Sequence, residues 1–510
     1  MPPISRRESV SRDRRWITPL ILLAVALVAR AQTFGNPVIG FDEQFYLLVG
    51  DRMLHGALPY VDIFDRKPAG LFLIFAAARA LGGDGFLQYK LVALGFVVAT
   101  AWAINGIARR GGASGFAALL AAALYILWLN FMEGEGGQSP VFYNLPMVAA
   151  AALVLRIPRG GDPRRAGAGA MLLVGVALQI KYSVVVEGIF FGCWLIALGW
   201  TAGQRGRRLA GSIATWIALA LAPTLAAFAA YAAIGQARAF VFANVLSALA
   251  QGRGGLSTQL EGLAAILGIL ALPVLLALSG RRGRARGQNG GRHDRFLSGW
   301  LAAATIGMLL YWRFASPHYA LPLLPPLMSL LAPAIDAGRR RRIVGLALAA
   351  VGLIGGQAVL AITAQQKGGA RAAAAVARAA HVGGEDGGRG CIYVYDGYPA
   401  LYMLTGSCLP TRWPFPGHLA TQDESRAAAL GVDPAREVRR ILATRPVAIV
   451  DDWPHFSGGN PVTRRILDRT LAADYVLAAR ICTGPRRVRL VYRLRTERHP
   501  PSPGAFACAS

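Results

Sequence analysis

The sequence has little charge, few acids and few cysteines. Charged residues make up 16% of its 510 residues, well below the roughly 25% of ordinary soluble domains. Acidic residues number only 27 against 54 Lys and Arg, and there are five cysteines. Because hydrophobic residues reach 54%, the composition excludes a disordered chain and argues against an ordinary soluble enzyme. Most of the chain is therefore predicted to lie in a lipid bilayer.

The excess positive charge does not indicate a nucleic-acid partner, because it lies in short breaks between apolar runs. These breaks contain Arg109-Arg110, Arg164-Arg165, Arg205 to Arg208, Arg281 to Arg286, and Arg339 to Arg342. Arg beside a membrane span resists translocation, so such breaks are typical of cytoplasmic loops. The net charge of +27 thus indicates how the chain is oriented in the membrane. The predicted partners are membrane lipids, and no nucleic acid is expected.

The apolar runs predict a polytopic α-helical membrane protein with about 11 transmembrane helices. They cover residues 16–34, 86–108, 113–131, 140–157, 167–182, 184–201, 209–233, 262–279, 297–313, 319–336 and 343–363. Residues 1–15 form a basic cytoplasmic tail, and the first run is a retained anchor because no small-residue cleavage site follows it. An odd number of spans places the C-terminus outside. Residues 68–81 are predicted as a helix at the outer interface, since a full span there would put the Arg clusters outside.

The composition changes after residue 363. The predicted organisation is a transmembrane catalytic domain over 16–363 with a first outer loop at 35–85, a linker over 364–390, and a small extracytoplasmic α/β domain over 391–510. Strands are expected at residues 391–395, 447–450 and 488–494, and a helix at 425–442. Cys391, Cys408, Cys482 and Cys508 lie in this domain, and sequence alone does not choose among their pairings.

The first outer loop collects most of the candidate chemistry. Asp42-Glu43 follows the first apolar run, and Asp62 and Asp65 precede Arg66-Lys67. Asp42 and Glu43 are expected in the first turn of a short helix, where the helix dipole alone could explain them. The other interpretation is functional, because adjacent acids at membrane depth are costly unless they have a task.

Three stretches of this loop carry a family resemblance. They are Asp42-Glu43-Gln44-Phe45-Tyr46, Pro59-Tyr60-Val61-Asp62, and Lys67-Pro68-Ala69-Gly70-Leu71. In this arrangement the sequence resembles the bacterial glycosyltransferase family 39 group, relatives of the protein O-mannosyltransferases and of the aminoarabinose transferase of lipid A, with the GT-C fold. Ala69 departs from the pattern, since many relatives have a second proline there. Leu178 to Lys181, and Ser316 to Pro325, fit later parts of the same family.

The resemblance implies transfer of a sugar from a polyprenyl-phosphate donor to an acceptor, with inversion, on the outer face of a bacterial inner membrane. An acceptor hydroxyl must lose a proton as it attacks, so Asp42 is the predicted base and Glu43 its helper. The leaving phosphate needs cations. The predicted phosphate ligands are Arg66, Lys67, Lys181 and Arg313. For Lys181 the other interpretation is snorkelling of its ammonium to the headgroups.

Further residues are predicted to contact the donor or the acceptor, which is a cell-envelope glycan, lipopolysaccharide or a protein. They are Tyr46, Tyr60, Asp62, Glu135, His318 and Tyr319. The tyrosines also suit an interfacial aromatic belt, and His318 a satisfied polar residue. No cofactor is specified by the sequence, and a divalent cation at the loop acids is left open because no ligand spacing is diagnostic.

Two alternatives come from other classes of protein. A transporter or flippase for lipid-linked saccharide would place its charges inside the spans, whereas here the acids gather in the outer loops. An assembly factor or receptor would leave Asp42 without a chemical task. In the outer domain, Tyr395-Asp396 and Asp451-Asp452-Trp453 are expected in turns after strands. Packed turns are one interpretation of them, and contact with an acceptor carbohydrate is the other.

Overall fold

The computed structural model describes residues 16–252, 254–281, 290–381, 390–495 and 506–507. The chain divides into two compact units. The first, here the helical unit, comprises Met1–Gln32, Lys90–Ala227 and Gly255–Leu360. The second, here the sheet unit, comprises Thr33–Tyr89, Phe228–Gly254 and Ala361–Ser510. The first outer loop thus shares a unit with the C-terminal segment.

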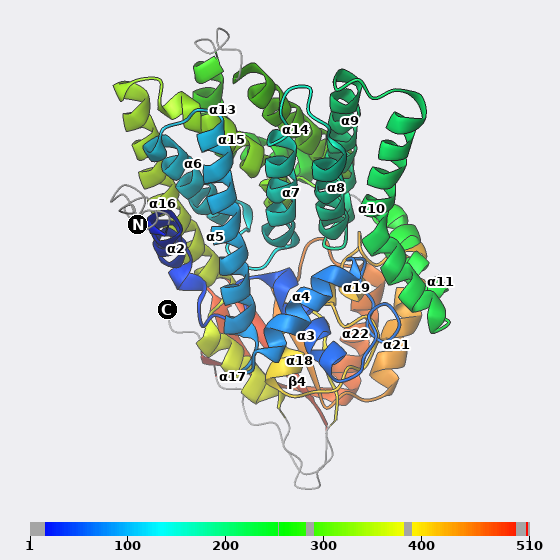
Figure 1. Cartoon of the computed structure of the whole chain (residues 1–510). Helices are drawn as coiled ribbons and strands as arrows, with labels where there is room; N and C mark the ends of the chain where they lie inside the picture. The colour runs from blue at the N-terminus through cyan, green and yellow to red at the C-terminus, as the bar shows by residue number, and fades with distance from the viewer. Residues whose placement is uncertain (1–15, 253, 282–289, 382–389, 496–505, 508–510) are drawn as a thin grey trace, which may run out of the picture. The chain divides into compact units, whose positions relative to one another are not determined.

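Long helices make up the helical unit, and a helix covers each of the predicted apolar runs (Figure 1). They are α2 (Ile17–Arg30), α5 (Phe86–Arg110), α6 (Gly115–Trp128), α7 (Ser139–Leu155), α8 (Arg164–Leu178), α9 (Val185–Thr201), α10 (Gly206–Ala233), α13 (Leu256–Arg281), α14 (Gly290–Tyr311), α15 (Leu324–Ile335) and α16 (Arg339–Lys367). Short 3-10 turns η2 (Leu129–Met132), η3 (Tyr182–Val184) and η5 (Pro317–Leu323) extend α6, α9 and α15. Among the described residues, seven helical segments are long and apolar enough to cross a membrane. The count of eleven spans stays a prediction.

The sheet unit begins with two helices of the first outer loop, α3 (Phe41–Leu54) and α4 (Ala69–Ala80). The predicted interfacial helix is therefore present as α4, and its depth in the membrane stays a prediction. Residues 237–250 form α11 (Ala237–Val241), the π-helical η4 (Phe242–Leu246) and α12 (Ser247–Ala250). Helix α17 (Ala370–Ala380) leads into the C-terminal segment.

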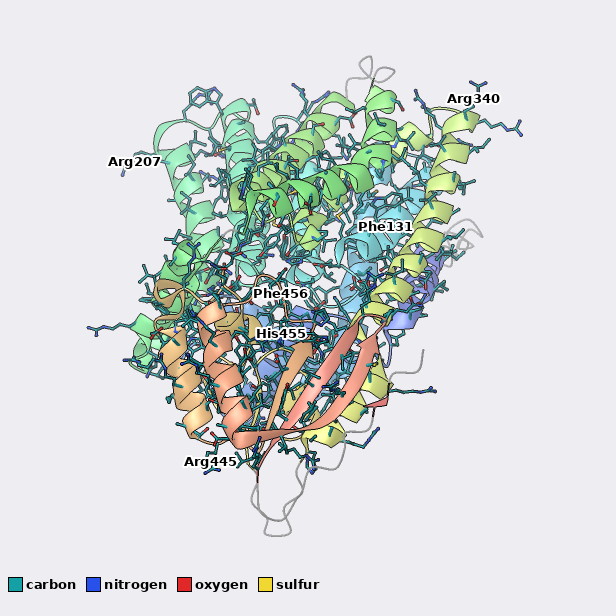
Figure 2. The ribbon with its side chains drawn as sticks, turned by 180° about the vertical axis from the view of Figure 1, so that it is seen from behind. Phe131, Arg207, Arg340, Arg445, His455 and Phe456 are labelled. Atoms are coloured by element: carbon teal, nitrogen blue, oxygen red, sulfur yellow. A yellow bond between two sulfur atoms is a disulfide. The ribbon has the colours of Figure 1, made fainter. Side chains whose placement is uncertain are left out.

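A five-stranded sheet organises the C-terminal segment. Its strands are β1 (Ile392–Val394), β2 (Ala448–Trp453), β3 (Tyr475–Gly484), β4 (Arg487–Leu494) and β5 (Phe506–Ala507), in the order β1-β2-β4-β3-β5. Strands β1 and β2 are parallel, β4 is antiparallel to β2 and β3, and β5 is parallel to β3. Its helices are α18 (Leu401–Leu404), α19 (Pro416–Ala420), α20 (Ala427–Leu430), α21 (Pro434–Ala443) and α22 (Pro461–Asp474). Figure 2 shows Arg445 before β2 and His455 after it, at opposite ends of the sheet.

The three predicted strands are confirmed, whereas the single helix over 425–442 is wrong. Gly431, at φ +70°, ends α20, and Asp433 caps a new helix by accepting from the backbone N–H groups of Ala435 and Arg436. A left-handed residue followed by an N-cap separates two helices, which the helical spacing of apolar residues did not reveal. The sequence leaves the cysteine pairing open, and the structure contains a disulfide between Cys391 and Cys408. Cys508 lies outside the described residues.

Helices α3 and α4 pack closely against each other at Gly50. A Cβ on Gly50 would lie 2.6 Å from the backbone N of Ala76 and 2.8 Å from the backbone C of Phe75. Backbone atoms cannot move aside as a flexible side chain can, so only a residue without a Cβ fits. This contact fixes the packing of the helix that carries Asp42 and Glu43.

Replacing this glycine tests the packing. Gly50→Ala is expected to lower the free energy of unfolding by about 1–3 kcal/mol, because overpacking separates the two helices. Thermal unfolding of the full-length protein in detergent measures the effect. Gly95→Ala is the matched control, since a Cβ on Gly95 meets no atom within 4 Å. Equal melting temperatures for the two variants would contradict the packing argument.

Candidate functional site

The N-terminus of α3 carries the two acids that the sequence singled out. Gly40 is the N-cap in an extended conformation, and Asp42 and Glu43 occupy the first turn, as predicted. The helix dipole stabilises negative charge there. Glu43 is only 1% exposed, and its carboxylate folds back over Gly40, where an added Cβ would overlap it. Asp42 remains partly exposed.

The buried amide of Gln44 holds this turn in place. Its Nε2 donates to the carbonyl oxygens of Gly40, at 2.8 Å, and Val38, at 3.2 Å. Its Oε1 accepts from the backbone N–H of Ala400 at 3.3 Å. The side chain is 0% exposed, so these bonds are not shared with bulk water. The backbone of the acidic turn is therefore fixed from the C-terminal segment of the same unit.

Asp42 and Lys67 both contact Tyr46. The Tyr46 hydroxyl donates to Asp42 Oδ2 at 3.3 Å, and Lys67 Nζ lies 5.6 Å from the centroid of the Tyr46 ring. Asp65 Oδ1 accepts from the Lys67 backbone N–H at 3.0 Å and lies 4.0 Å from Lys67 Nζ. A proton acceptor and a cation thus lie around one aromatic ring. In this arrangement a carboxylate can accept the proton of an attacking hydroxyl, and a cation can stabilise the charge of a departing anion.

Tyr60 supports Lys67 through a strained turn. Its φ is +69° and its side chain is 0% exposed, a conformation that persists in a bulky residue only when the surroundings impose it. The Tyr60 hydroxyl donates to the Lys67 carbonyl oxygen at 2.7 Å. Its ring lies 5.3 Å from that of Tyr231 and 5.9 Å from that of Phe240. Asp62, which is exposed, accepts from the Leu58 backbone N–H at 2.7 Å and so stabilises this turn.

Arg66 is engaged by a carboxylate. Its Nη1 lies 2.5 Å from Glu424 Oε2, its Nε donates to Ser247 Oγ at 2.7 Å, and its side chain is 8% exposed. The positive charges of Arg66 and Lys67, together with burial as the largest cause, hold the pKa of His418 well below its ordinary value. His418 is thus neutral. Of the two cations, Lys67 is the one whose ammonium lies at the ring of Tyr46, the residue that is hydrogen-bonded to Asp42.

The remaining predicted residues lie in the helical unit. Lys181 is 4% exposed, with its Nζ 3.9 Å from the centroid of the Tyr319 ring. His318 Nδ1 lies 2.7 Å from Glu133 Oε2, so the predicted histidine pairs with an acid two residues before Glu135. The side chain of Arg30 donates to the backbone carbonyl oxygen of Glu135 at 2.9 Å. Arg313 lies in the turn between α14 and η5.

Several residues that shape the site have no role in the prediction from the sequence. Asp65 is one of several acids in the first outer loop, and its place two residues before Lys67 is the feature of the sequence that indicates its role. Glu424, and the bond from Ala400 to Gln44, are not indicated by the sequence, because Arg66 and Ala400 lie 358 and 356 positions from their partners. In the part of the chain that the structure describes, no three His, Cys, Asp or Glu side chains gather in a way that fits a metal ion.

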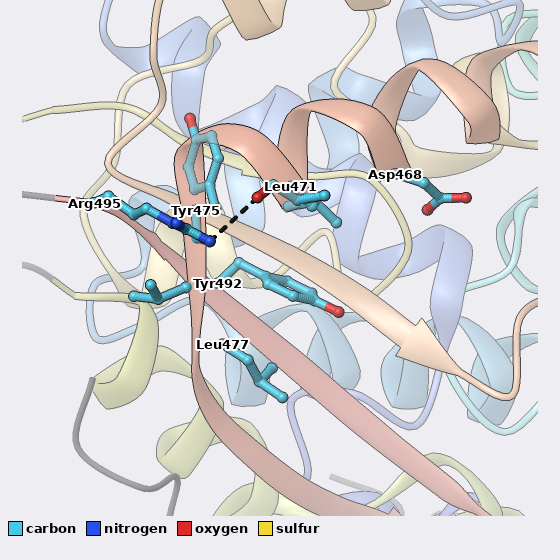
Figure 3. Close-up of a pocket in the computed structure, with 8 residues that line it drawn as sticks. Asp468, Leu471, Tyr475, Leu477, Tyr492 and Arg495 are labelled. Carbon is cyan, nitrogen blue, oxygen red and sulfur yellow. Dashed lines mark hydrogen bonds between the residues drawn. The ribbon is translucent and has the colours of Figure 1, made fainter. Parts of the chain in front are cut away.

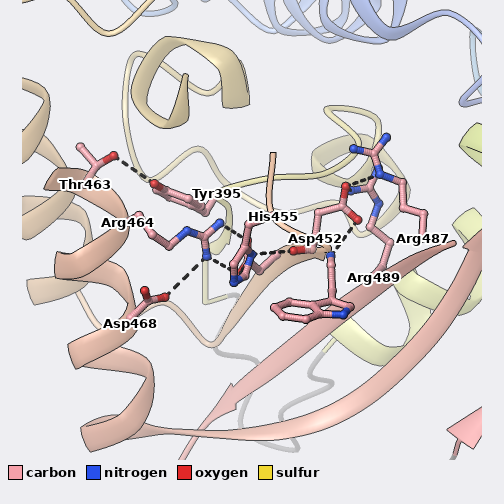
Figure 4. Close-up of polar contacts among 10 residues, drawn as sticks. Tyr395, Asp452, His455, Thr463, Arg464, Asp468, Arg487 and Arg489 are labelled. Carbon is pink, nitrogen blue, oxygen red and sulfur yellow. Dashed lines mark hydrogen bonds and ion pairs between the residues drawn. The ribbon is translucent and has the colours of Figure 1, made fainter. Parts of the chain in front are cut away.

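Tyr395 and Asp396 follow β1 as predicted, whereas two other acids of the C-terminal segment lie elsewhere than predicted. Asp451 and Asp452 are inside β2 and are 1% and 0% exposed. Arg464 binds Asp451 through both Nη atoms at 2.6 and 2.9 Å, and Asp452 pairs with Arg487 and Arg489 (Figure 4). Burial raises the pKa of Asp452 to about 6. The expectation that these two acids follow the strand in a turn is wrong, because β2 runs on to residue 453.

The ion pair between Arg66 and Glu424 can be tested by its effect on stability. Glu424→Gln is expected to lower the free energy of unfolding by about 1–3 kcal/mol, because it leaves a buried guanidinium without its carboxylate. Thermal unfolding is the measurement, and Asp423→Asn, at the neighbouring position, is the control. Restoration of stability by the double variant Arg66→Met with Glu424→Met would support the pair, and equal melting of Glu424→Gln and the control would contradict it.

No family model matches the chain, and no curated protein matches it. The crystal structure of ArnT from Cupriavidus metallidurans bound to undecaprenyl phosphate is similar, with a TM-score of 0.61, 16% identity, and coverage of 93% of this chain and 98% of that chain. The apo structure of the same ArnT gives a TM-score of 0.62, 16% identity, and coverage of 94% and 98%. At this identity the likeness establishes the fold. The chain therefore has an ArnT-like GT-C fold with a small C-terminal sheet domain, which confirms the predicted fold class and, at the level of fold, the predicted resemblance to aminoarabinose transferases.

Proposed function

We propose that this protein is a membrane glycosyltransferase that moves a sugar from a polyprenyl-phosphate donor to an acceptor hydroxyl. The observation that carries the proposal is the grouping of Asp42, Tyr46 and Lys67 at the N-terminus of α3. The ArnT-like fold supports it, since one of the similar structures is described as bound to undecaprenyl phosphate. The proposed setting is the outer face of a bacterial inner membrane, with the C-terminal domain in the periplasm.

Asp42 is proposed as the general base. The acceptor oxygen attacks the anomeric carbon while its proton passes to the Asp42 carboxylate. The bond from the anomeric carbon to the phosphate oxygen breaks at the same time, and the polyprenyl phosphate leaves with the electron pair. Attack opposite the leaving group inverts the anomeric centre. The first-turn position of Asp42 favours its charged form, which is the form a base needs.

Lys67 is proposed as the cation that receives the phosphate. Asp65 and Tyr60 fix its backbone, so its ammonium meets the growing charge without rearrangement. Preorganised charge of this kind is the largest contribution that a site of this type makes to rate. Arg66, engaged by Glu424, is proposed to hold Lys67 in position rather than to bind phosphate itself.

Supporting roles are proposed for the other predicted residues. Glu43, buried beside Gly40, positions Asp42, and the hydroxyl of Tyr46 orients the Asp42 carboxylate. Donor or acceptor contacts are proposed for the following residues. They are Tyr60, Asp62, Lys181, Arg313, Glu135, His318 and Tyr319.

Loss of the base is the direct test of the proposal. Asp42→Asn keeps the shape of the side chain but removes its basicity, and is expected to lower the transfer rate by about 10²–10⁴-fold. The measurement is incorporation of labelled sugar from polyprenyl-phosphate donor into acceptor by membranes that carry each variant. Asp84→Asn, an exposed acid of the same unit, is the control. Undiminished transfer by Asp42→Asn would remove the assignment, and sugar movement across sealed vesicles without transfer would indicate a transporter instead.

A further inference from the structure

A groove of about 470 Å³ lies on the C-terminal domain between α22 and the strands β3 and β4. Figure 3 shows its lining residues. They include Asp468, Leu471, Tyr475, Leu477, Tyr492 and Arg495. This volume is in the range of sites for small ligands. None of these residues has a part in the proposed transfer chemistry.

The groove shares one face of the sheet with an exposed tryptophan. In the register of β2 and β4, Ile449 pairs with Tyr492 and Trp453 pairs with Val488. Side chains two and four residues apart on a strand point to the same side, so Tyr492 and Trp453 lie on one face. The bidentate pairing of Arg464 with Asp451 puts α22 over that same face. Four residues of strand separate the two aromatic positions by about 13 Å.

Polar groups on this face are held in fixed positions between and beside the aromatic rings. The Asp468 side chain is 52% exposed and lies 3.6 Å from Arg464, which Asp451 anchors. Arg495 donates through Nε to the Tyr475 carbonyl oxygen at 3.1 Å and through Nη2 to the Ala472 carbonyl oxygen at 3.2 Å. The carboxylate and the guanidinium are thus positioned before any ligand arrives, which lowers the entropic cost of binding.

We propose that this face, from the groove at Tyr492 to Trp453, binds an oligosaccharide that is the glycan part of the acceptor. Pyranose rings have apolar C–H faces and a rim of hydroxyl groups. The rings of Tyr492 and Trp453 match the apolar faces, and the side chains of Asp468, Arg495 and His455 match the hydroxyls. His455, whose ring lies 5.0 Å from that of Trp453, has a side chain that is 39% exposed.

Two other ligand classes fit this face less well. A phosphorylated ligand would be repelled by the Asp468 carboxylate, and Arg495, the cation of the groove, already donates to two backbone carbonyl oxygens. A purely apolar partner would cover Asp468 and part of Arg495, and would have to remove these charges from water. The separation of the two rings favours a ligand of several sugar units over a monosaccharide. The identity of the glycan as part of the acceptor rests on the proposed transferase function, whereas the binding of an oligosaccharide to this face does not.

Binding of bacterial envelope oligosaccharides tests the inference. The full-length protein in nanodiscs is applied to an array of such oligosaccharides, and the tightest binder is then titrated in solution. Tyr492→Ala and Trp453→Ala are each expected to weaken binding about tenfold, because each removes one stacking ring. Tyr492→Phe keeps the ring and is expected to retain most of the affinity. Arg469→Ala, on α22 beside Asp468 and outside the lining of the groove, is the matched control.

The outcomes separate this inference from the proposed function. Binding of no oligosaccharide on the array, or unchanged binding by folded Tyr492→Ala and Trp453→Ala, overturns the inference. In transfer assays, Tyr492→Ala is expected to raise the KM for acceptor about tenfold with kcat unchanged. Transfer with an unchanged KM overturns the inference and leaves the proposed function standing. Glycan binding by a protein that transfers no sugar supports the inference and overturns the proposed function.

Discussion

The candidate site depends on one partly buried ion pair, between Arg66 and Glu424. Arg66 directly precedes Lys67, so fixing its guanidinium also fixes the backbone that carries the proposed phosphate ligand. Two further bonds fasten the same loop to the C-terminal segment. The Phe64 backbone N–H donates to the Arg412 carbonyl oxygen at 2.7 Å, and Arg412 Nη2 donates to the Tyr60 carbonyl oxygen at 2.8 Å. The C-terminal domain is thus part of the support of the site.

This support explains the strained and buried features of the loop. Tyr60 is held in a left-handed conformation by contacts on both sides, and Glu43 and Asp65 are acids with little exposure to water. Each would be unfavourable alone. Contacts from the C-terminal segment and from the loop stabilise Tyr60 and Asp65, and the helix dipole stabilises Glu43. Rigidity of this kind suits a site in which charge must be stabilised as it forms.

Local patterns in the sequence predicted the features that local physics decides. Long apolar runs predicted the helices, and the position of Asp42 and Glu43 after Gly40 predicted a first helical turn. Such local patterns do not reveal contacts between residues that are far apart in the sequence. Arg66 is separated from Glu424 by 358 positions and from Ser247 by 181, so nothing near Arg66 indicated its partners. For the same reason Asp451 and Asp452 suggested ligand contacts, whereas in the structure arginines from α22 and β4 neutralise them.

The central claim is that Lys67 binds the phosphate of the donor and Asp42 acts only on the acceptor. Titration of a polyprenyl phosphate into the full-length protein in detergent, followed by native mass spectrometry, tests both halves at once. The account predicts that Lys67→Met weakens binding by about tenfold or more, while Asp42→Asn binds as the wild type does. Wild-type affinity in folded Lys67→Met would contradict the account.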